Sequence, residues 1–305
     1  MVDQNIRCSS VGTSFQRTDL KDKVLGIAKY TADLSLPNML HARVLRSPHP
    51  HANILSIDVQ SALKMAGVHD ILTPFNVGVG KIAPDVPILD TKVRFVGDEV
   101  AAIAAVNLYE ADTAIDLIKV SYDVLPFSTN IDTSLEMGNP KIHTQGNIVN
   151  GGPIVEARGN VEEGFGQADY IVEDSFTTPD HHPASLEPRA ALASWDGTRL
   201  TMWKPSRGIH ADKAILASAL DINPNNITVI GPVMGAGYGS KDETRTSILA
   251  ALLSMRTGRP VKLELNREEE FLAGRRRHST STKIKMGVKK DGTVTAVHVK
   301  TVMDT

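Results

Sequence analysis

Cysteine is almost absent from this chain, which has 305 residues and a single thiol, Cys8. One cysteine excludes an internal disulfide, a cysteine-rich zinc site and an iron–sulfur cluster held by this chain alone. No apolar run is long enough to span a bilayer, and residues 1–7 lack the apolar core of a signal peptide. These absences predict a protein of the reducing cytoplasm without a membrane span.

An excess of charge is also missing. The chain has 33 lysines and arginines against 35 aspartates and glutamates, and its longest basic run is residues 275–277, followed by His278. A balanced chain offers no extended basic surface to a polyanion, so nucleic acid is not an expected partner. The short basic run fits either an anion-binding group or a solvated charge cluster, and we favour the solvated cluster.

The length exceeds that of one average domain and predicts two. Between residues 127 and 153 the composition shifts toward Asn, Gly, Ser, Thr and Pro, and the periodic apolar pattern lapses. We therefore predict a first α/β unit at residues 1–130, a linker at 131–152 and a second α/β unit at 153–305.

Hydrophobic periodicity predicts a mixed α/β chain. The expected helices are residues 59–66, 109–118, 161–167, 209–220 and 246–255. The expected strands are residues 53–59, 93–96, 118–122, 170–177, 189–195, 200–203, 227–230, 261–265 and 294–302. Because the last strand stops three residues before Thr305, we expect it to need a partner or to mark a shortened chain.

Three glycines surround an aromatic residue in the segment 231–245, between an expected strand and an expected helix. Gly235, Gly237 and Gly239 match neither the dinucleotide-binding pattern nor a P-loop. Bare backbone and unpaired N–H groups near a helix N-terminus form a cradle for an anionic cofactor. The glycines alone fit a tight packing turn equally well.

Seven segments in order along the chain resemble the molybdenum-binding large subunit of the xanthine dehydrogenase and aldehyde oxidase family, the molybdenum hydroxylases. They are residues 11–14, 23–33, 46–52, 93–102, 186–188, 235–241 and 257–262. The resemblance covers nearly the whole chain. It implies an α+β fold, with an α/β-hammerhead domain at 1–130 and the first part of a molybdopterin-binding domain at 153–305.

In that family the glycine loop reads Gly-Gly-Gly-Phe-Gly-Gly-Lys and packs against the molybdenum end of the cofactor. Two residues depart from this pattern, Ala236 and Ser240. Tyr238 takes the place of the phenylalanine. The cofactor-binding residues that the resemblance implies are Gly235, Ala236, Gly237, Tyr238 and Gly239.

His181 stands where many members have a glutamine that hydrogen-bonds an oxygen ligand of the metal, so the resemblance makes it a cofactor-binding candidate. Without the resemblance, His181 and His182 read as surface or packing histidines. Direct metal ligation by this pair is not expected, because adjacent residues of an extended segment point to opposite faces and no third ligand is near. Glu187 and Arg189, which flank Pro188, fit a buried structural pair as well as a catalytic role.

Asp242 follows the glycine loop, where some members place an acidic residue that contacts a heterocyclic substrate. The resemblance makes it the substrate-binding candidate of this chain. Glu243 is expected to be an ordinary acidic residue of a helix first turn.

The resemblance implies oxidation of an electron-poor carbon, with water as the oxygen source and a glutamate as base. That base lies in sequence that would follow Thr305 or on a partner chain, so no catalytic residue is assigned here. The implied cofactor is molybdopterin with molybdenum, with its cytosine dinucleotide as a variant form. Implied partners are an iron–sulfur subunit with 2Fe-2S clusters, an FAD subunit and a second molybdopterin-binding chain.

An aromatic N-heterocycle or a purine is the expected substrate. An aryl-thioester and an aldehyde are the alternatives within the family. A non-catalytic scaffold that keeps the fold is the alternative from another class, because Ala236, Ser240 and His181 depart from the family pattern.

Overall fold

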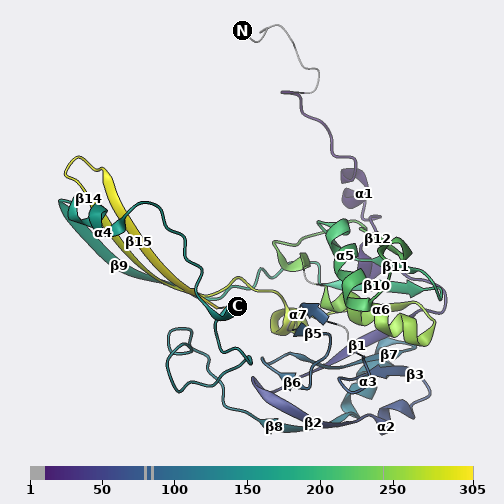
Figure 1. Cartoon of the computed structure of the whole chain (residues 1–305). Coiled ribbons are helices and arrows are strands. Elements are labelled where there is room, and N and C mark those ends of the chain that lie inside the picture. The colour runs from purple at the N-terminus through teal and green to yellow at the C-terminus, as the bar shows by residue number, and fades with distance from the viewer. Residues whose placement is uncertain (1–10, 79–80, 84–85, 243, 305) are drawn as a thin grey trace.

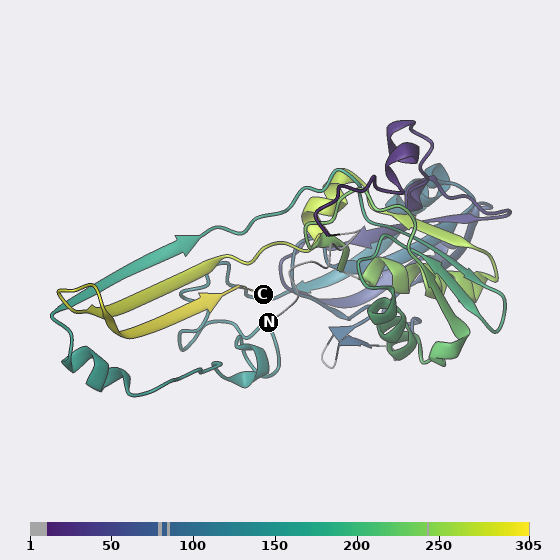
Figure 2. The ribbon, with the colours of Figure 1, turned by 90° about the horizontal axis from the view of Figure 1, so that it is seen from above.

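The computed structural model describes residues 11–78, 81–83, 86–242 and 244–304, so Cys8 and Glu243 lie outside the described residues. A lobe carries the larger sheet and most of the helices, and an arm built on a three-stranded sheet projects from it (Figures 1 and 2). No helix in the described ranges combines the length and apolarity needed to cross a membrane.

One seven-stranded sheet forms the framework of the lobe. Its strands, in spatial order, are β12 (Ile227–Ile230), β11 (Leu200–Trp203), β10 (Ala190–Trp195), β13 (Val261–Glu264), β1 (Leu40–Arg46), β7 (Glu99–Ala105) and β3 (Val68–Leu72). Parallel pairing of Leu40 with Val261 joins β1 to β13. The sheet is therefore continuous across the two units that the composition separates.

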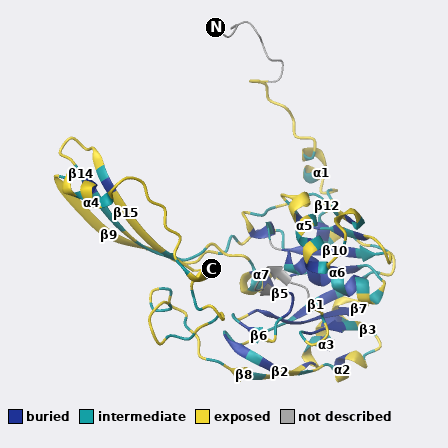
Figure 3. Ribbon diagram, viewed as in Figure 1, coloured by how far each residue is buried: buried dark blue, intermediate teal, exposed yellow. Residues whose placement is uncertain are grey.

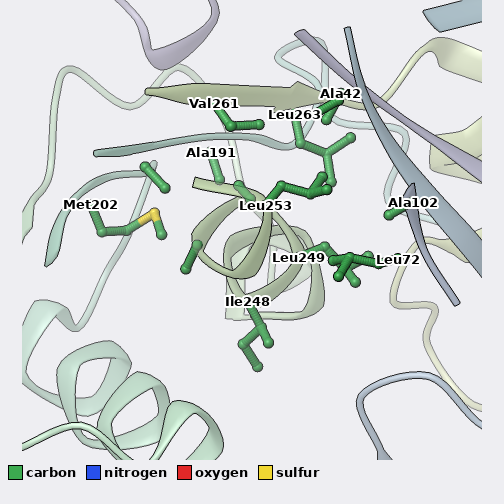
Figure 4. Close-up of a cluster of buried hydrophobic side chains, with 14 of the residues drawn as sticks. Ala42, Leu72, Ala102, Ala191, Met202, Ile248, Leu249, Leu253, Val261 and Leu263 are labelled. Atoms are coloured by element: carbon green, nitrogen blue, oxygen red, sulfur yellow. The ribbon is translucent and has the colours of Figure 1, made fainter. Parts of the chain in front are cut away.

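Helix α6 (Arg245–Thr257) forms the centre of the core and packs on β10 and β13 (Figure 4). Its Ile248, Leu249 and Leu253 are at most 2% exposed. The helix ends at Gly258, whose φ of 64° is a left-handed conformation that suits glycine. Because α6 is buried in the core, it fixes the position of the segment 231–242 that leads into it.

Smaller elements complete the lobe. Strands β6 (Lys92–Val93), β2 (Ala52–Asp58) and β8 (Lys119–Val124) form a second sheet, and β4 (Lys81–Ala83) pairs with β5 (Val86–Pro87). The remaining lobe helices are α1 (Leu20–Val24), α2 (Gln60–Leu63), α3 (Leu108–Asp116), α5 (Ile209–Leu220) and α7 (Arg267–Ala273). Helix α3 is capped by Asn107, whose side chain accepts from the amide of Glu110.

The arm consists of β15 (Val294–Met303), β14 (Thr280–Val288) and β9 (Tyr170–Thr178), in that order, with α4 (Val161–Gly166) beside it. Helix α4 covers one face, where Phe165 lies against Gly287 and under Lys285. Directly paired residues share a face, so the other face carries Val172, Met286 and Val297. Val172 is 58% exposed and Val297 is 45% exposed, which leaves this face largely uncovered (Figure 3).

Most of the expected elements are present, and those at 200–203, 209–220 and 227–230 have the expected bounds. The helix expected at 59–66 is wrong in extent, because only the single turn Gln60–Leu63 forms. The strand expected at 93–96 is also wrong beyond Val93. There the amide of Arg94 donates to Asp98 Oδ2 at 3.0 Å and Gly97 adopts a φ of 99°, so the chain turns.

Candidate functional site

The glycine loop follows β12 and turns sharply at two positions with left-handed backbone. Tyr238 has a φ of 49° and Gly239 a φ of 91°. Within the described residues, the amides of Gly237, Tyr238 and Gly239 donate to no protein acceptor. Three consecutive free donors, two of them on left-handed residues of an exposed turn, are available to an anionic group.

Two further amides of the loop are already engaged. The carboxylate oxygen Oε2 of Glu187 accepts from Gly235 at 2.8 Å and from Ala236 at 3.3 Å. A Cβ on Gly235 would lie 3.2 Å from the ring of Tyr30, so only glycine fits this close approach without a shift. Gly235 and Ala236 therefore anchor the loop to Glu187, and the donors open to a ligand come from the next three residues.

The helix expected to start directly after the loop begins at Arg245, and a 3-10 turn at Ser240–Asp242 lies between them. The Oγ of Ser240, which is buried, donates to the carbonyl of Gly237 at 2.7 Å. The hydroxyl of Ser240, which departs from the family pattern, therefore points into the protein and closes the loop by a hydrogen bond. The free donors belong to the loop itself and not to the first turn of α6.

A buried network joins the loop to residues 186–188. Lys241 Nζ donates to the carbonyls of Glu187 at 2.7 Å and Pro188 at 2.6 Å, and burial lowers the pKa of Lys241. Arg189 Nε donates to the carbonyl of Ser240 at 2.8 Å, while its Nη1 donates to Glu270 at 2.8 Å. The suggested pair of Glu187 with Arg189 is wrong: Arg189 pairs with Glu270, and Glu187 holds the loop.

A cavity of about 700 Å³ lies beside the loop and brings together four of the residues that the sequence predicts as site residues, His181, Tyr238, Gly239 and Asp242. His181 reaches it because its backbone pairs with that of Arg277, at N–O distances of 3.1 and 2.7 Å. Gly235, Ala236 and Gly237 lie outside its lining. The neighbouring His182 points away from the cavity lining and packs on Phe271, with ring centroids 4.8 Å apart.

The basic run that the sequence analysis treated as a solvated cluster lines this cavity. Arg275 lies 3.7 Å from Asp242, and Arg207 lies 2.7 Å from the same carboxylate. Arg276 pairs with Asp180 at 2.7 Å. Asp242, the substrate-binding candidate, is therefore held between two guanidinium groups, and its charge is largely balanced before any ligand binds.

A second cavity, of about 560 Å³, is lined in part by the buried Asp98, which the sequence did not indicate as a site residue. Burial, together with the neighbouring charge of Glu99, raises the pKa of Asp98 to about 6. The amides of Arg94 and Glu99 donate to its carboxylate and oppose this shift in pKa. No sequence pattern distinguishes Asp98 from an exposed turn residue, because the shift comes from packing.

Asp98 predicts a specific pH dependence of stability. Its folded pKa lies above its ordinary value of 3.8, so protonation favours the folded state as the pH falls. From pH 7 to pH 5, wild type should gain about 1.4 kcal/mol of unfolding free energy relative to Asp98→Asn. Urea denaturation of both proteins at pH 5, 6 and 7 measures this difference. An identical pH dependence of the two proteins would contradict the assignment.

The donor set of the site suits an organic anion better than a directly ligated metal ion. In the described part of the chain, no group of three or more His, Cys, Asp or Glu side chains is placed to hold a metal. The loop offers backbone N–H groups, and the adjoining cavity offers guanidinium and imidazole groups. These groups bind phosphate, carboxylate and oxo groups.

Two family models match the chain. Residues 25–126 match the a/b hammerhead domain of aldehyde oxidase and xanthine dehydrogenase, and residues 142–305 match the molybdopterin cofactor-binding domain. The second match alone covers more than half of the chain, which is enough to show family membership.

Curated relatives and solved structures agree with these models. The chain is 36% identical to a probable xanthine dehydrogenase component of Bacillus subtilis, over 95% of this chain and 39% of that protein. It is 33% identical to "Nicotinate dehydrogenase large molybdopterin subunit" of Eubacterium barkeri, over 97% of this chain and 70% of that protein. Quinoline 2-oxidoreductase from Pseudomonas putida 86 superposes with a TM-score of 0.85 at 29% identity, over 95% of this chain and 39% of that one. The chain therefore spans well under half the length of the first and third of these proteins.

The matched domains occur in the order that the sequence resemblance implies, and the glycine loop and His181 lie in the second of them. The mixed α/β architecture, with its hammerhead and cofactor-binding regions, is confirmed. The chain belongs to the molybdopterin-binding xanthine dehydrogenase and aldehyde oxidase family.

Proposed function

We propose that this chain is the N-terminal part of the molybdopterin-binding subunit of a molybdenum hydroxylase, acting on an electron-poor carbon of an aromatic N-heterocycle or purine. The observation that carries the proposal is the run of free amides at residues 237–239, of which Tyr238 and Gly239 line one cavity with His181. The named activities of the relatives, on xanthine and on nicotinate, support this substrate class. An aldehyde or an aryl-thioester is the alternative substrate.

The residues present fit the proposed cofactor. The amides of Gly237, Tyr238 and Gly239 would hold its oxygen atoms, and the imidazole of His181 would donate to an oxygen at its metal end. Gly235 and Ala236 would act indirectly, through the Glu187 contact that holds the loop. When bound, the molybdenum centre would supply the two-electron oxidation with water as the oxygen source. Asp242 would face the substrate.

The remaining parts of the reaction are assigned to partners. One cysteine leaves no ligand set for a 2Fe-2S cluster, so the clusters and the FAD belong to other subunits in this proposal. The single thiol also agrees with a reducing cytoplasm. The catalytic glutamate would come from further sequence or from a second molybdopterin-binding chain.

That further region would cover the uncovered face of the arm. On this face Val172, Met286 and Val297 form one cross-strand row, and both Val172 and Val297 are about half exposed. Apolar surface of this kind is costly to leave in water and favours burial against another protein surface.

Cofactor analysis tests the proposal. The chain purified with its native partners should contain about one molybdenum and one pterin per complex, and released cytosine nucleotide would identify the dinucleotide form. An intact, iron-loaded complex with neither molybdenum nor pterin would instead support the scaffold function.

A further inference from the structure

The cavity beside the glycine loop carries more positive charge than its own carboxylates balance. Four arginines and two histidines line it, against the single carboxylate of Asp242. Asp242 serves both Arg207 and Arg275, and Arg276 pairs with Asp180 outside the lining. In the described part of the chain, the guanidinium of Arg277 has neither an ion pair nor a side-chain hydrogen bond. The cavity is therefore prepared for an added anion.

Backbone contacts fix the position of Arg277 in the cavity lining. The two hydrogen bonds between His181 and Arg277 hold Arg277 at the rim, next to the cofactor-binding candidate. Directly before the cluster, Gly274 passes so close to helix α7 that a Cβ would lie 1.9 Å from the carbonyl of Glu270. The arginines thus follow a tightly packed turn.

The cavity also offers an aromatic surface. The side chain of Tyr238 is 79% exposed and lines the same cavity as Arg277. Its ring can pack against an aromatic ligand while a guanidinium receives a carboxylate in bidentate fashion. A neutral purine would offer the exposed guanidinium of Arg277 no carboxylate to pair with.

We infer that this cavity selects an aromatic substrate that bears a carboxylate, and that Arg277 is the residue that recognises it. The inference rests on the proposed function, because it names the substrate class of that same site. An anionic phosphate of the cofactor would present similar chemistry to the arginines, so the experiment separates the two sources.

Binding is measured on the complex purified with its native partners, by isothermal titration with benzoate and with its neutral isostere benzamide. Wild type should bind benzoate at least tenfold more tightly than benzamide. Arg277→Gln should weaken benzoate binding about tenfold and leave benzamide binding unchanged. Arg158→Gln is the matched control, because it removes an exposed arginine outside the cavity lining.

Kinetics and cofactor content complete the test. With pyridine-3-carboxylate as substrate, Arg277→Gln should raise KM about tenfold with little change in kcat, while molybdenum and pterin stay at the wild-type level. Equal binding of benzoate by wild type and Arg277→Gln would overturn the inference. Loss of pterin from Arg277→Gln would also overturn it, because the arginine would then serve the cofactor phosphate.

A wild-type complex that lacks molybdenum and pterin yet binds benzoate through Arg277 would refute the proposed function. It would still support an anion-selective cavity. Failure of the inference and failure of the proposed function are therefore distinguishable.

Discussion

Replacing Glu270 by alanine is expected to lower the free energy of unfolding by about 3–5 kcal/mol. Glu270 is fully buried, and its carboxylate accepts from both the backbone amide and the Nη1 of Arg189. Without it, the guanidinium of Arg189, whose side chain is 4% exposed, loses its ion pair with Glu270. The cost of losing this buried, charge-assisted pairing exceeds the cost of the lost methylene packing.

Urea denaturation followed by circular dichroism measures this effect. The matched control is Asp180→Ala, which breaks an ion pair with Arg276 whose side chains are 49% and 47% exposed. That change should alter stability by less than about 1 kcal/mol. A similar small loss in Glu270→Ala would show that the remaining contacts of Arg189, such as its bond to the carbonyl of Ser240, are sufficient. Replacing both Arg189 and Glu270 by methionine should recover part of the stability, because the buried guanidinium is then removed together with its carboxylate.

Periodicity predicted the elements in the second half of the chain well. Strand 200–203 alternates buried and partly buried residues, helix 209–220 buries Asp212, Leu216 and Ala219 on one face, and both form as expected. Strand β7 was missed because its sequence from Glu99 to Ala105 is rich in alanine and buried throughout, which removes the alternation. Helix α7 was missed although Asn266 and Glu269 form a capping box, a signal that the sequence does carry.

The candidate site was only partly visible in the sequence. The glycines and Tyr238 indicated an open backbone, and the structure gives Tyr238 and Gly239 the left-handed conformations that produce it. The contacts of Glu187 with the loop and of His181 with Arg277 join residues about 50 and 96 positions apart. Nothing in the local pattern encodes such pairings, because they depend on how β10, α6 and the arm meet.

The charge of the cavity beside the glycine loop could likewise not be predicted from local sequence. From the sequence, residues 275–277 fit an anion-binding group or a solvated cluster, and the second was favoured because a short basic run is usually solvated. In the structure these arginines line one cavity. Arg275 and Arg207 share the carboxylate of Asp242, while Arg277 lies at the rim. A charge cluster becomes a recognition site only when its counterions are fewer than its cations within one cavity.

Gly237→Val is expected to reduce the molybdenum and pterin content of the complex at least tenfold while leaving the fold largely intact. The φ of Gly237 is not in the left-handed region, so valine is compatible with the backbone. A Cβ there would lie 3.3 Å from Lys241 Cγ, a contact that a shift of a few tenths of an ångström relieves. The branched side chain would nevertheless stand at the first of the three free amides and obstruct the cofactor.

Gly231→Val is the matched control for this substitution. It places the same side chain at the start of the same segment, where a Cβ would have an ordinary contact of 3.5 Å with Ile209. Molybdenum and pterin should stay at the wild-type level in this control, and both variants should unfold within about 2 kcal/mol of wild type. Full cofactor content in Gly237→Val would show that residues 237–239 do not form the cradle. The free amides would then be an ordinary feature of a solvated turn.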